Sequence, residues 1–266
     1  MTEQRIALGI SYQGTSYHGF QSQPTVPTVQ QALEEAISSV ANHTIRVAPA
    51  GRTDRGVHAT GQVIHFDTHS ERQEKAWVSG VNALLPDDIS VSWMRSVPGD
   101  FDARRSATSR RYQYWILNQA LRQALGHAFV AREHRPLDAQ AMHDSAQALL
   151  GEQDFSAFRA AHCQSLTPWR CVQDVQVVRR EKMVVLDITA NAFLHHMVRN
   201  IAGALIEVGI GARDIGWIAH LLAARDRQLA GKMASGSGLY LKAVNYPERF
   251  GLPAVEPQTE ADWPFS

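Results

Sequence analysis

The stretch IALGISY at positions 6–12, followed by TVQQALEEAI at positions 28–37, decides the fold class of this chain. In the first stretch apolar residues alternate with small or polar ones, and this period of two predicts a half-buried strand. In the second stretch Thr28 and Gln31 have the spacing of a capping box, and apolar residues recur at helical spacing, so we expect a helix over 28–40. The chain therefore begins with a strand and an amphipathic helix.

Segments with the strand period and segments with the helix period continue to follow one another up to position 250. We expect further strands at 44–48, 62–66, 89–97, 112–117, 172–178, 183–189 and 239–244. We expect further helices at 71–84, 138–150 with Asp138 as its cap, 193–208, and from 214. Because the mixed pattern occurs twice, the sequence predicts two α+β domains that join within 96–110. We assign 1–105 to an N-terminal domain, 106–250 to a C-terminal domain, and 251–266 to an extended tail.

Length and composition place the chain among globular proteins. Its 266 residues, 44% of them hydrophobic, can bury a core unaided. With Cys163 and Cys171 as the only cysteines, a disulfide framework or a four-cysteine zinc site is excluded. The segment MTEQRIALGI does not resemble a secretory signal, and no apolar run approaches the ~18 residues that a membrane span needs. We therefore expect a cytoplasmic protein that does not enter a membrane.

Charge is balanced overall but uneven along the chain. Lys plus Arg and Asp plus Glu are 26 each, yet 22 of the basic residues are arginines. Seven arginines lie in 101–135, where Asp102 and Glu133 are the only acidic residues. Arginine pairs bidentately with phosphate and stacks on bases, so this segment could hold a polyanion. A compositional bias towards arginine explains the same counts, and the composition alone does not decide between the two.

A loop with the sequence GRTDRGVH at 51–58 is the first candidate for chemistry. Its glycines allow a sharp turn or a close backbone approach. Asp54 lies between Arg52 and Arg55, and a nearby cation favours the ionised form of a carboxylate. Asp54 could therefore act as a nucleophile or a base. The alternative is that Asp54 only caps a turn, as most loop aspartates do.

Two further segments carry arginines beside aromatic or small residues. In SATSRRYQYW at 106–115, a strand would place Tyr112 on one face and Arg111 with Trp115 on the other, which suits base stacking beside a phosphate track. Core packing explains this pattern equally well.

On the helix expected at 193–208, Arg199 follows the pair His195 and His196. Adjacent residues on a helix diverge by about 100°, and no third ligand accompanies the pair, so we expect no metal there.

Several cofactor motifs are missing from the sequence. It contains neither a Walker-type phosphate loop, nor a dinucleotide fingerprint after a strand, nor a G-x-S-x-G elbow. Phosphoryl transfer from ATP, hydride transfer and serine acyl transfer are therefore disfavoured. We expect chemistry without a cofactor.

The motifs at 51–58 and 61–66 closely resemble the signature of the tRNA pseudouridine synthase A (TruA) family. Other segments resemble the family in the same order along the chain: FDAR at 101–104, SATSRRY at 106–112, DFSAFR at 154–159, 191–203, EVG at 207–209, and SGLYL at 237–241. Together they cover most of positions 5–250.

The resemblance implies roles for individual residues. Asp54 matches the family nucleophile, Tyr112 a tyrosine that stacks on the target base and takes part in proton transfer, and Arg199 the basic partner of the nucleophile. The remaining matches are to substrate-binding positions: Arg52 and Arg72, which are implicated in flipping the base; Phe101, Asp102, Ala103, Arg104 and Arg105, which with 162–166 match regions that contact tRNA; and Leu239, which packs against the pocket.

The resemblance also implies an architecture and a reaction. The expected fold is two ferredoxin-like α+β domains with joined antiparallel sheets and a central basic cleft, in a homodimer that binds tRNA. The expected reaction converts uridine to pseudouridine at positions 38, 39 and 40 of the anticodon stem-loop, without metal or cofactor. Arg55 and Arg105 depart from the family pattern, and both add positive charge, so we expect tighter or more salt-sensitive RNA binding.

Two other functions fit the residues taken without the resemblance. One is an RNA-binding module in which Asp54 is only a turn residue. The other is a cofactor-free hydrolase of small molecules that uses Asp54 and a histidine. Assaying unmodified tRNA for pseudouridine separates all three hypotheses.

Overall fold

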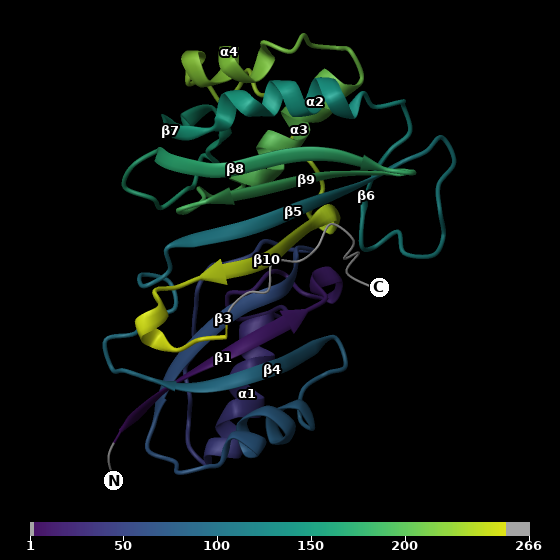
Figure 1. Ribbon diagram of the computed structural model, residues 1–266. Coiled ribbons are helices and arrows are strands. Elements are labelled where there is room, and N and C mark those ends of the chain that lie inside the picture. The colour runs from purple at the N-terminus through teal and green to yellow at the C-terminus, as the bar shows by residue number, and fades with distance from the viewer. Residues whose placement is uncertain (1–2, 254–266) are drawn as a thin grey trace. The chain divides into compact units, whose positions relative to one another are not determined.

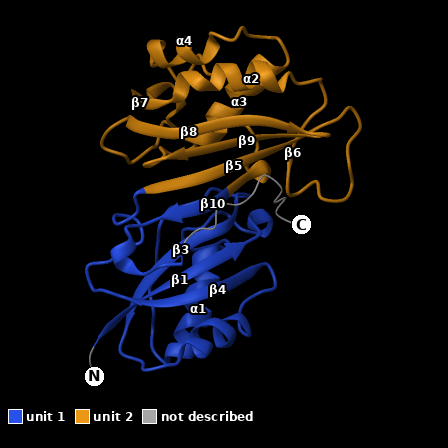
Figure 2. Ribbon diagram, viewed as in Figure 1, with its two compact units in different colours: residues 1–108, 241–266 blue, residues 109–240 orange. Residues whose placement is uncertain are grey.

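The computed structural model describes residues 3–253, which form two compact units (Figures 1 and 2). Unit 1 combines residues up to 108 with those from 241 onward, and unit 2 contains 109–240. Each unit has mixed α/β structure and mainly antiparallel strand pairing. The α+β expectation is therefore confirmed.

Unit 1 is an antiparallel sheet with a helix on one face (Figure 1). The strands lie in the order β4-β1-β3-β10, and β2 pairs with β3. Their bounds are β1 Gln4–Tyr12, β2 Ala48–Pro49, β3 His58–Thr68, β4 Ile89–Val97 and β10 Leu239–Asn245, and the helices are α1 Val29–Ala41 and a π-helical turn at Ala76–Gly80.

The sequence pattern explains the core of unit 1. Ile6, Leu8 and Ile10 are at most 1% exposed, and β1 pairs with both β3 and β4. Thr28 caps α1 by accepting a hydrogen bond from the Gln31 amide at 3.4 Å. The Gln31 side chain donates to Glu35, so only half of the expected capping box forms. The predicted strand and helix are otherwise confirmed.

Unit 2 repeats the arrangement with three helices. Its strands lie in the order β5-β9-β8-β7, and β6 pairs in parallel with β5. The bounds are β5 Ser109–Asn118, β6 Ala131–Glu133, β7 Gly151–Asp154, β8 Trp169–Arg180 and β9 Met183–Ala190, with α2 Ala139–Ala146, α3 Met197–Gly209 and α4 Trp217–Ala224. All three helices cover the same face of this sheet (Figure 1).

Several expected elements are shorter than predicted. The helix expected at 71–84 spans only 74–82 and has a π-helical centre at Ala76–Gly80. The strand expected at 44–48 is reduced to β2, because the amides before it donate to side chains of α1: Ile45 to Ser38 Oγ at 2.8 Å and Val47 to Glu34 Oε1 at 3.0 Å. The helix expected from 193 begins at Met197, because His196 has a left-handed backbone with φ 63°. Asp138 does cap α2, through the Ala141 amide at 3.0 Å.

The chain passes from unit 1 to unit 2 after Thr108, within the expected 96–110 junction. It returns to unit 1 at Leu241, and this return differs from the expected domains. Residues 241–250, expected in the second domain, belong to unit 1 because β10 pairs with β3. Gly61 of β3 comes so close to β10 that an added Cβ would lie 2.1 Å from the Lys242 oxygen. The expected tail lies outside the described residues from 254 onward.

We predict that Gly203→Ala destabilises the protein. A Cβ on Gly203 of α3 would lie 2.1 Å from the Lys232 oxygen, and overpacking of this kind costs about 1–3 kcal/mol. Chemical denaturation should show the loss in the free energy of unfolding. Gly99→Ala is the control, because nothing lies within 4 Å of its added Cβ; equal stability of both variants would contradict the packing argument.

Candidate active site

The loop between β2 and β3 carries Asp54 on a tight turn of unit 1. The Val57 amide donates to the Asp54 carbonyl at 3.1 Å, and Gly56 has φ 75°. The neighbouring Thr53 is 7% exposed and Val57 2% exposed, whereas Asp54 is only half-buried. The turn therefore buries the side chains of Thr53 and Val57 and leaves Asp54 partly exposed to solvent.

Hydrogen bonds from three other segments fix this loop. Thr53 is held on both sides: its Oγ1 lies 2.8 Å from Tyr12 Oη, and its carbonyl accepts the Phe20 amide at 3.0 Å. Gln62 Nε2 donates to the Gly51 carbonyl at 2.7 Å. The position of the Asp54 backbone is thus set by β1, by β3 and by the segment after β1.

Two glycines in the segment after β1 make this support possible. An added Cβ on Gly14 would lie 2.0 Å from the Val57 oxygen, and one on Gly19, which has φ 95°, would lie 2.7 Å from the Thr53 oxygen. Only glycine allows both approaches. The sequence analysis missed these supporting residues; the signal that could have found them is the pair of glycines in GTSYHG at 14–19.

His58, the histidine of the same loop, has a structural role. It is 2% exposed, and its Nδ1 accepts the Gly14 amide at 3.1 Å. A buried ring used in this way is a poor general base, since its acceptor nitrogen already holds the loop. This geometry argues against His58 as the histidine of the hydrolase hypothesis.

In unit 2, Tyr112 lies on β5 beside an aromatic partner. Its side chain is 9% exposed, and its ring meets Phe193 edge to face with centroids 5.0 Å apart. Phe193 lies between β9 and α3. The two rings form an aromatic pair in this part of unit 2, and stacking of a base on Tyr112 stays a prediction.

The other residues of the 106–115 pattern are structural. Arg111 forms a two-pronged pair with Asp187 on β9, at 2.8 and 2.6 Å. This pair raises the pKa of Arg111 through the hydrogen bond from its guanidinium to Asp187. Trp115 is 5% exposed and donates to Gln113. Trp115 therefore lies in the core, as the alternative interpretation expected, and the guanidinium of half-buried Arg111 is engaged by Asp187.

Arg199 lies in the first turn of α3 and is tied to a segment far along the chain. Its Nε donates to the Ala234 carbonyl at 2.9 Å, and its own carbonyl accepts the Ala234 amide at 3.1 Å. Tyr114 Oη donates to the next carbonyl, that of Ser235, at 2.8 Å. Burial raises the pKa of Tyr114, and the charge of Arg199 opposes that rise. The guanidinium is thus held in place at the start of the helix.

The remaining predicted site residues fall into two groups by exposure. Arg52, Arg72, Arg104 and Arg105 are exposed, and Asp102 is half-buried. Phe101 and Ala103 are fully buried, and Leu239 at the start of β10 is 6% exposed. The side chains of Phe101 and Ala103 therefore belong to the core of unit 1, and their predicted contact with RNA is not one that these side chains can make as they lie.

The predicted residues are distributed over both units. Asp54, Arg52, Arg72 and residues 101–105 belong to unit 1, and Tyr112, Arg199 and Leu239 to unit 2. The pairing of Asp54 with Arg199 stays a prediction. The histidine pair departs from the geometry expected of it: His195 and His196 precede α3, and their ring centroids lie 3.8 Å apart.

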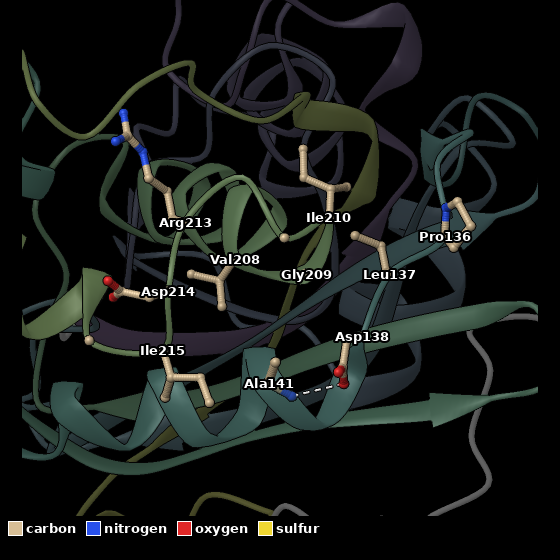
Figure 3. A pocket seen from close by; sticks show the side chains of 12 residues that line it. Pro136, Leu137, Asp138, Ala141, Val208, Gly209, Ile210, Arg213, Asp214 and Ile215 are labelled. Atoms are coloured by element: carbon tan, nitrogen blue, oxygen red, sulfur yellow. Dashed lines mark hydrogen bonds between the residues drawn. The ribbon is translucent and has the colours of Figure 1, made fainter.

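A separate hollow in unit 2 has a volume of about 820 Å³. It lies between the start of α2 and the end of α3, lined by residues such as Leu137, Val208 and Ile215 (Figure 3). None of the predicted site residues lines it.

Within residues 3–253, no helix has the length and apolar character to cross a bilayer.

We predict that Tyr12→Phe loosens the Asp54 loop. Burial raises the pKa of Tyr12 to about 12, so the phenol stays neutral and its bond to Thr53 persists at ordinary pH. Losing that bond should cost about 1 kcal/mol of stability and speed amide exchange in residues 51–57. Tyr17→Phe, which removes a bond to Asp88, is the control; equal exchange of the loop in both variants would contradict this.

Comparison with known proteins identifies the family. The family model described as tRNA pseudouridine synthase matches residues 9–104 and 145–247. The tRNA pseudouridine synthases A of Enterobacter sp. (strain 638) and Escherichia fergusonii are each 57% identical over 249 residues, which is 94% of this chain and 92% of theirs. The chain therefore belongs to the tRNA pseudouridine synthase family and is an isomerase that acts on uridine in tRNA.

Proposed function

We propose that this chain converts uridine to pseudouridine at positions 38, 39 and 40 of the anticodon stem-loop, with Asp54 as the nucleophile and without a cofactor. The observation that carries the proposal is the Asp54 loop, which is fixed by Tyr12, Phe20 and Gln62, while Asp54 itself is only half-buried. A catalytic group must be held precisely and still reach its substrate. This loop meets both requirements.

The proposed reaction rearranges one nucleotide and needs no second substrate. The bond from N1 of uracil to C1′ of the ribose breaks, the base turns, and a bond forms between C5 and C1′. The proton on C5 is lost to a base, and N1 gains a proton, so atoms and electrons balance without an oxidant or a phosphoryl donor. Asp54 assists through its carboxylate at the ribose, at C6 of the base, or in removing a sugar proton.

Two residues of unit 2 complete the proposed site. Arg199, held by Ala234, supplies the positive charge that pairs with the Asp54 carboxylate. Tyr112, packed on Phe193, offers its ring to the displaced base and its hydroxyl for proton transfer. Arg52 and Arg72, both exposed, contribute to flipping the uridine, which costs a few kcal/mol of unstacking.

The proposal extends to the assembly of the enzyme. We place the reaction in the cytoplasm, and we propose a homodimer in which both copies bind the tRNA. Shape and backbone recognition suit this substrate, since A-form RNA exposes its phosphates and 2′-hydroxyls more readily than its base edges. The surplus of arginine over lysine in the chain, 22 against 4, supports recognition of phosphate.

We predict that Asp54→Asn binds tRNA but forms no product. The amide keeps the size of the side chain and loses its charge and nucleophilicity, so turnover should fall at least about 1,000-fold. Carbodiimide mapping of pseudouridine measures product, and a filter-binding assay measures affinity. Asp87→Asn, on an exposed turn of the same unit, is the control. Full activity in Asp54→Asn would overturn the proposal, and a wild-type protein that binds tRNA without product would favour the RNA-binding module.

We predict that tRNA affinity falls steeply as salt rises. Each phosphate contact made by an arginine contributes about −0.7 to −0.9 to the slope of log K against log salt. Arg55→Ala and Arg105→Ala should each make the slope shallower by about one contact. A slope near zero for the wild-type protein would rule out the phosphate contacts proposed here.

A further inference from the structure

The turn at 99–106 in unit 1 is held from the core of that unit by two long side chains. Arg5 Nη1 donates to the carbonyls of Gly99 at 2.7 Å and Phe101 at 2.8 Å. Tyr246 Oη donates to the Ala103 carbonyl at 2.6 Å. These bonds satisfy three carbonyls of the turn, and they leave its amides to be satisfied separately.

His65 on β3 accepts one of those amides. The Ala103 N–H donates to His65 Nδ1 at 3.1 Å, and the His65 ring meets Phe101 edge to face, with centroids 5.9 Å apart. The His65 side chain is 8% exposed and also hydrogen-bonds the Ala48 backbone. Since Nδ1 accepts a hydrogen bond, the neutral ring carries its proton on Nε2.

The opposite side of the turn presents two arginines to solvent. Asp102 Oδ1 accepts the amides of Arg104 at 2.9 Å and Arg105 at 2.8 Å, and the Asp102 amide donates to Ser106 Oγ at 3.0 Å. The turn thus has a fixed backbone and two adjacent exposed guanidinium side chains. Such a pair suits the backbone phosphates of a nucleic acid, where contacts set position rather than read sequence.

We propose that His65 is a positioning residue for tRNA binding, fixing through the Ala103 amide the turn that presents Arg104 and Arg105 to phosphate. The inference rests on the proposed RNA contact of residues 101–105. His65 is buried and acts on RNA only through this turn. Its effect therefore belongs to binding, and the chemistry at Asp54 proceeds without it.

Protonation of His65 would break this arrangement, because an imidazolium has no acceptor nitrogen. Burial lowers the pKa of His65, and the charge of Arg5 lowers it further; Asp102, Asp67 and the Ala48 backbone oppose this. A lowered folded-state pKa means that the stabilisation is complete above the ordinary value of about 6.5 and is lost as pH falls towards the folded-state pKa. Acidification should therefore release the turn.

Three variants test the proposal. His65→Leu removes the acceptor, and His65→Asn supplies an amide oxygen that can accept the Ala103 N–H without titrating. His143→Leu is the matched control, since His143 Nδ1 in unit 2 accepts the Val177 amide at 3.2 Å in the same way. For each variant the measurements are thermal stability, the affinity for unmodified tRNA across a salt series, and kcat and KM.

We expect His65→Leu to weaken tRNA binding about tenfold and to make the salt slope shallower by about one phosphate contact. KM should rise with kcat nearly unchanged. His65→Asn should restore most of the affinity. It should also abolish the part of the pH dependence of binding below about pH 6.5 that the wild type shows beyond this variant. His143→Leu should lower stability without changing the salt slope.

A double variant separates positioning from general destabilisation. If His65 acts through the turn, adding His65→Leu to Arg104→Ala/Arg105→Ala should weaken binding much less than it does in the wild type. Additive losses, or a His65→Leu protein with wild-type salt slope and KM, would overturn the proposal. An Arg104→Ala/Arg105→Ala protein with unchanged tRNA affinity would overturn it too, while product formation in the same assay would leave the proposed reaction intact.

Discussion

The candidate site in unit 1 depends on the hydrogen bonds of Thr53. These bonds fix the backbone of the loop that carries Asp54. The Thr53 hydroxyl meets Tyr12, and its carbonyl accepts the Phe20 amide. Both bonds require the segment after β1 to lie against the loop, which the glycines at 14 and 19 allow. The catalytic hypothesis therefore rests on backbone geometry provided by residues that carry no reactive group. A rigid backbone beneath a half-buried carboxylate suits the proposed role of Asp54, because a catalytic group must be held in a fixed position.

In unit 2, contacts with distant backbone likewise hold the Arg199 side chain. Gly203 lets the chain at 232–235 run along the start of α3, and there Ala234 and Ser235 accept bonds from Arg199 and Tyr114. Side-chain donors to backbone carbonyls set the direction of a guanidinium more closely than a solvent-exposed ion pair does. In both units, the residues proposed for chemistry are oriented by backbone contacts distant in the sequence.

The sequence predicted the elements well where hydrophobic periodicity is strong and less well where side chains compete for backbone groups. The strands at 6–12 and 89–97 are confirmed. In the first, however, Ala7 and Gly9 are buried as well, so it is not the half-buried strand that its alternation predicts. Most of the strand expected at 44–48 is absent because amides before β2 bond to Ser38 and Glu34 on α1, a tertiary effect that no local pattern reveals. The helix expected from 193 begins only at Met197, because His196 adopts a left-handed backbone conformation. In the site, the motif at 51–58 identified Asp54, but the pairing of Arg111 with Asp187 and the burial of Phe101 depend on packing between segments far apart in the chain.

A crystal structure of the enzyme with an anticodon stem-loop containing 5-fluorouridine would test the central claim most directly. The account predicts that the modified uridine is flipped out of its helix and that the Asp54 carboxylate is bonded to its nucleotide or in van der Waals contact with it, with the Arg199 guanidinium paired to the same carboxylate. A bound nucleotide remote from Asp54, or an Asp54 carboxylate directed away from the RNA, would contradict it.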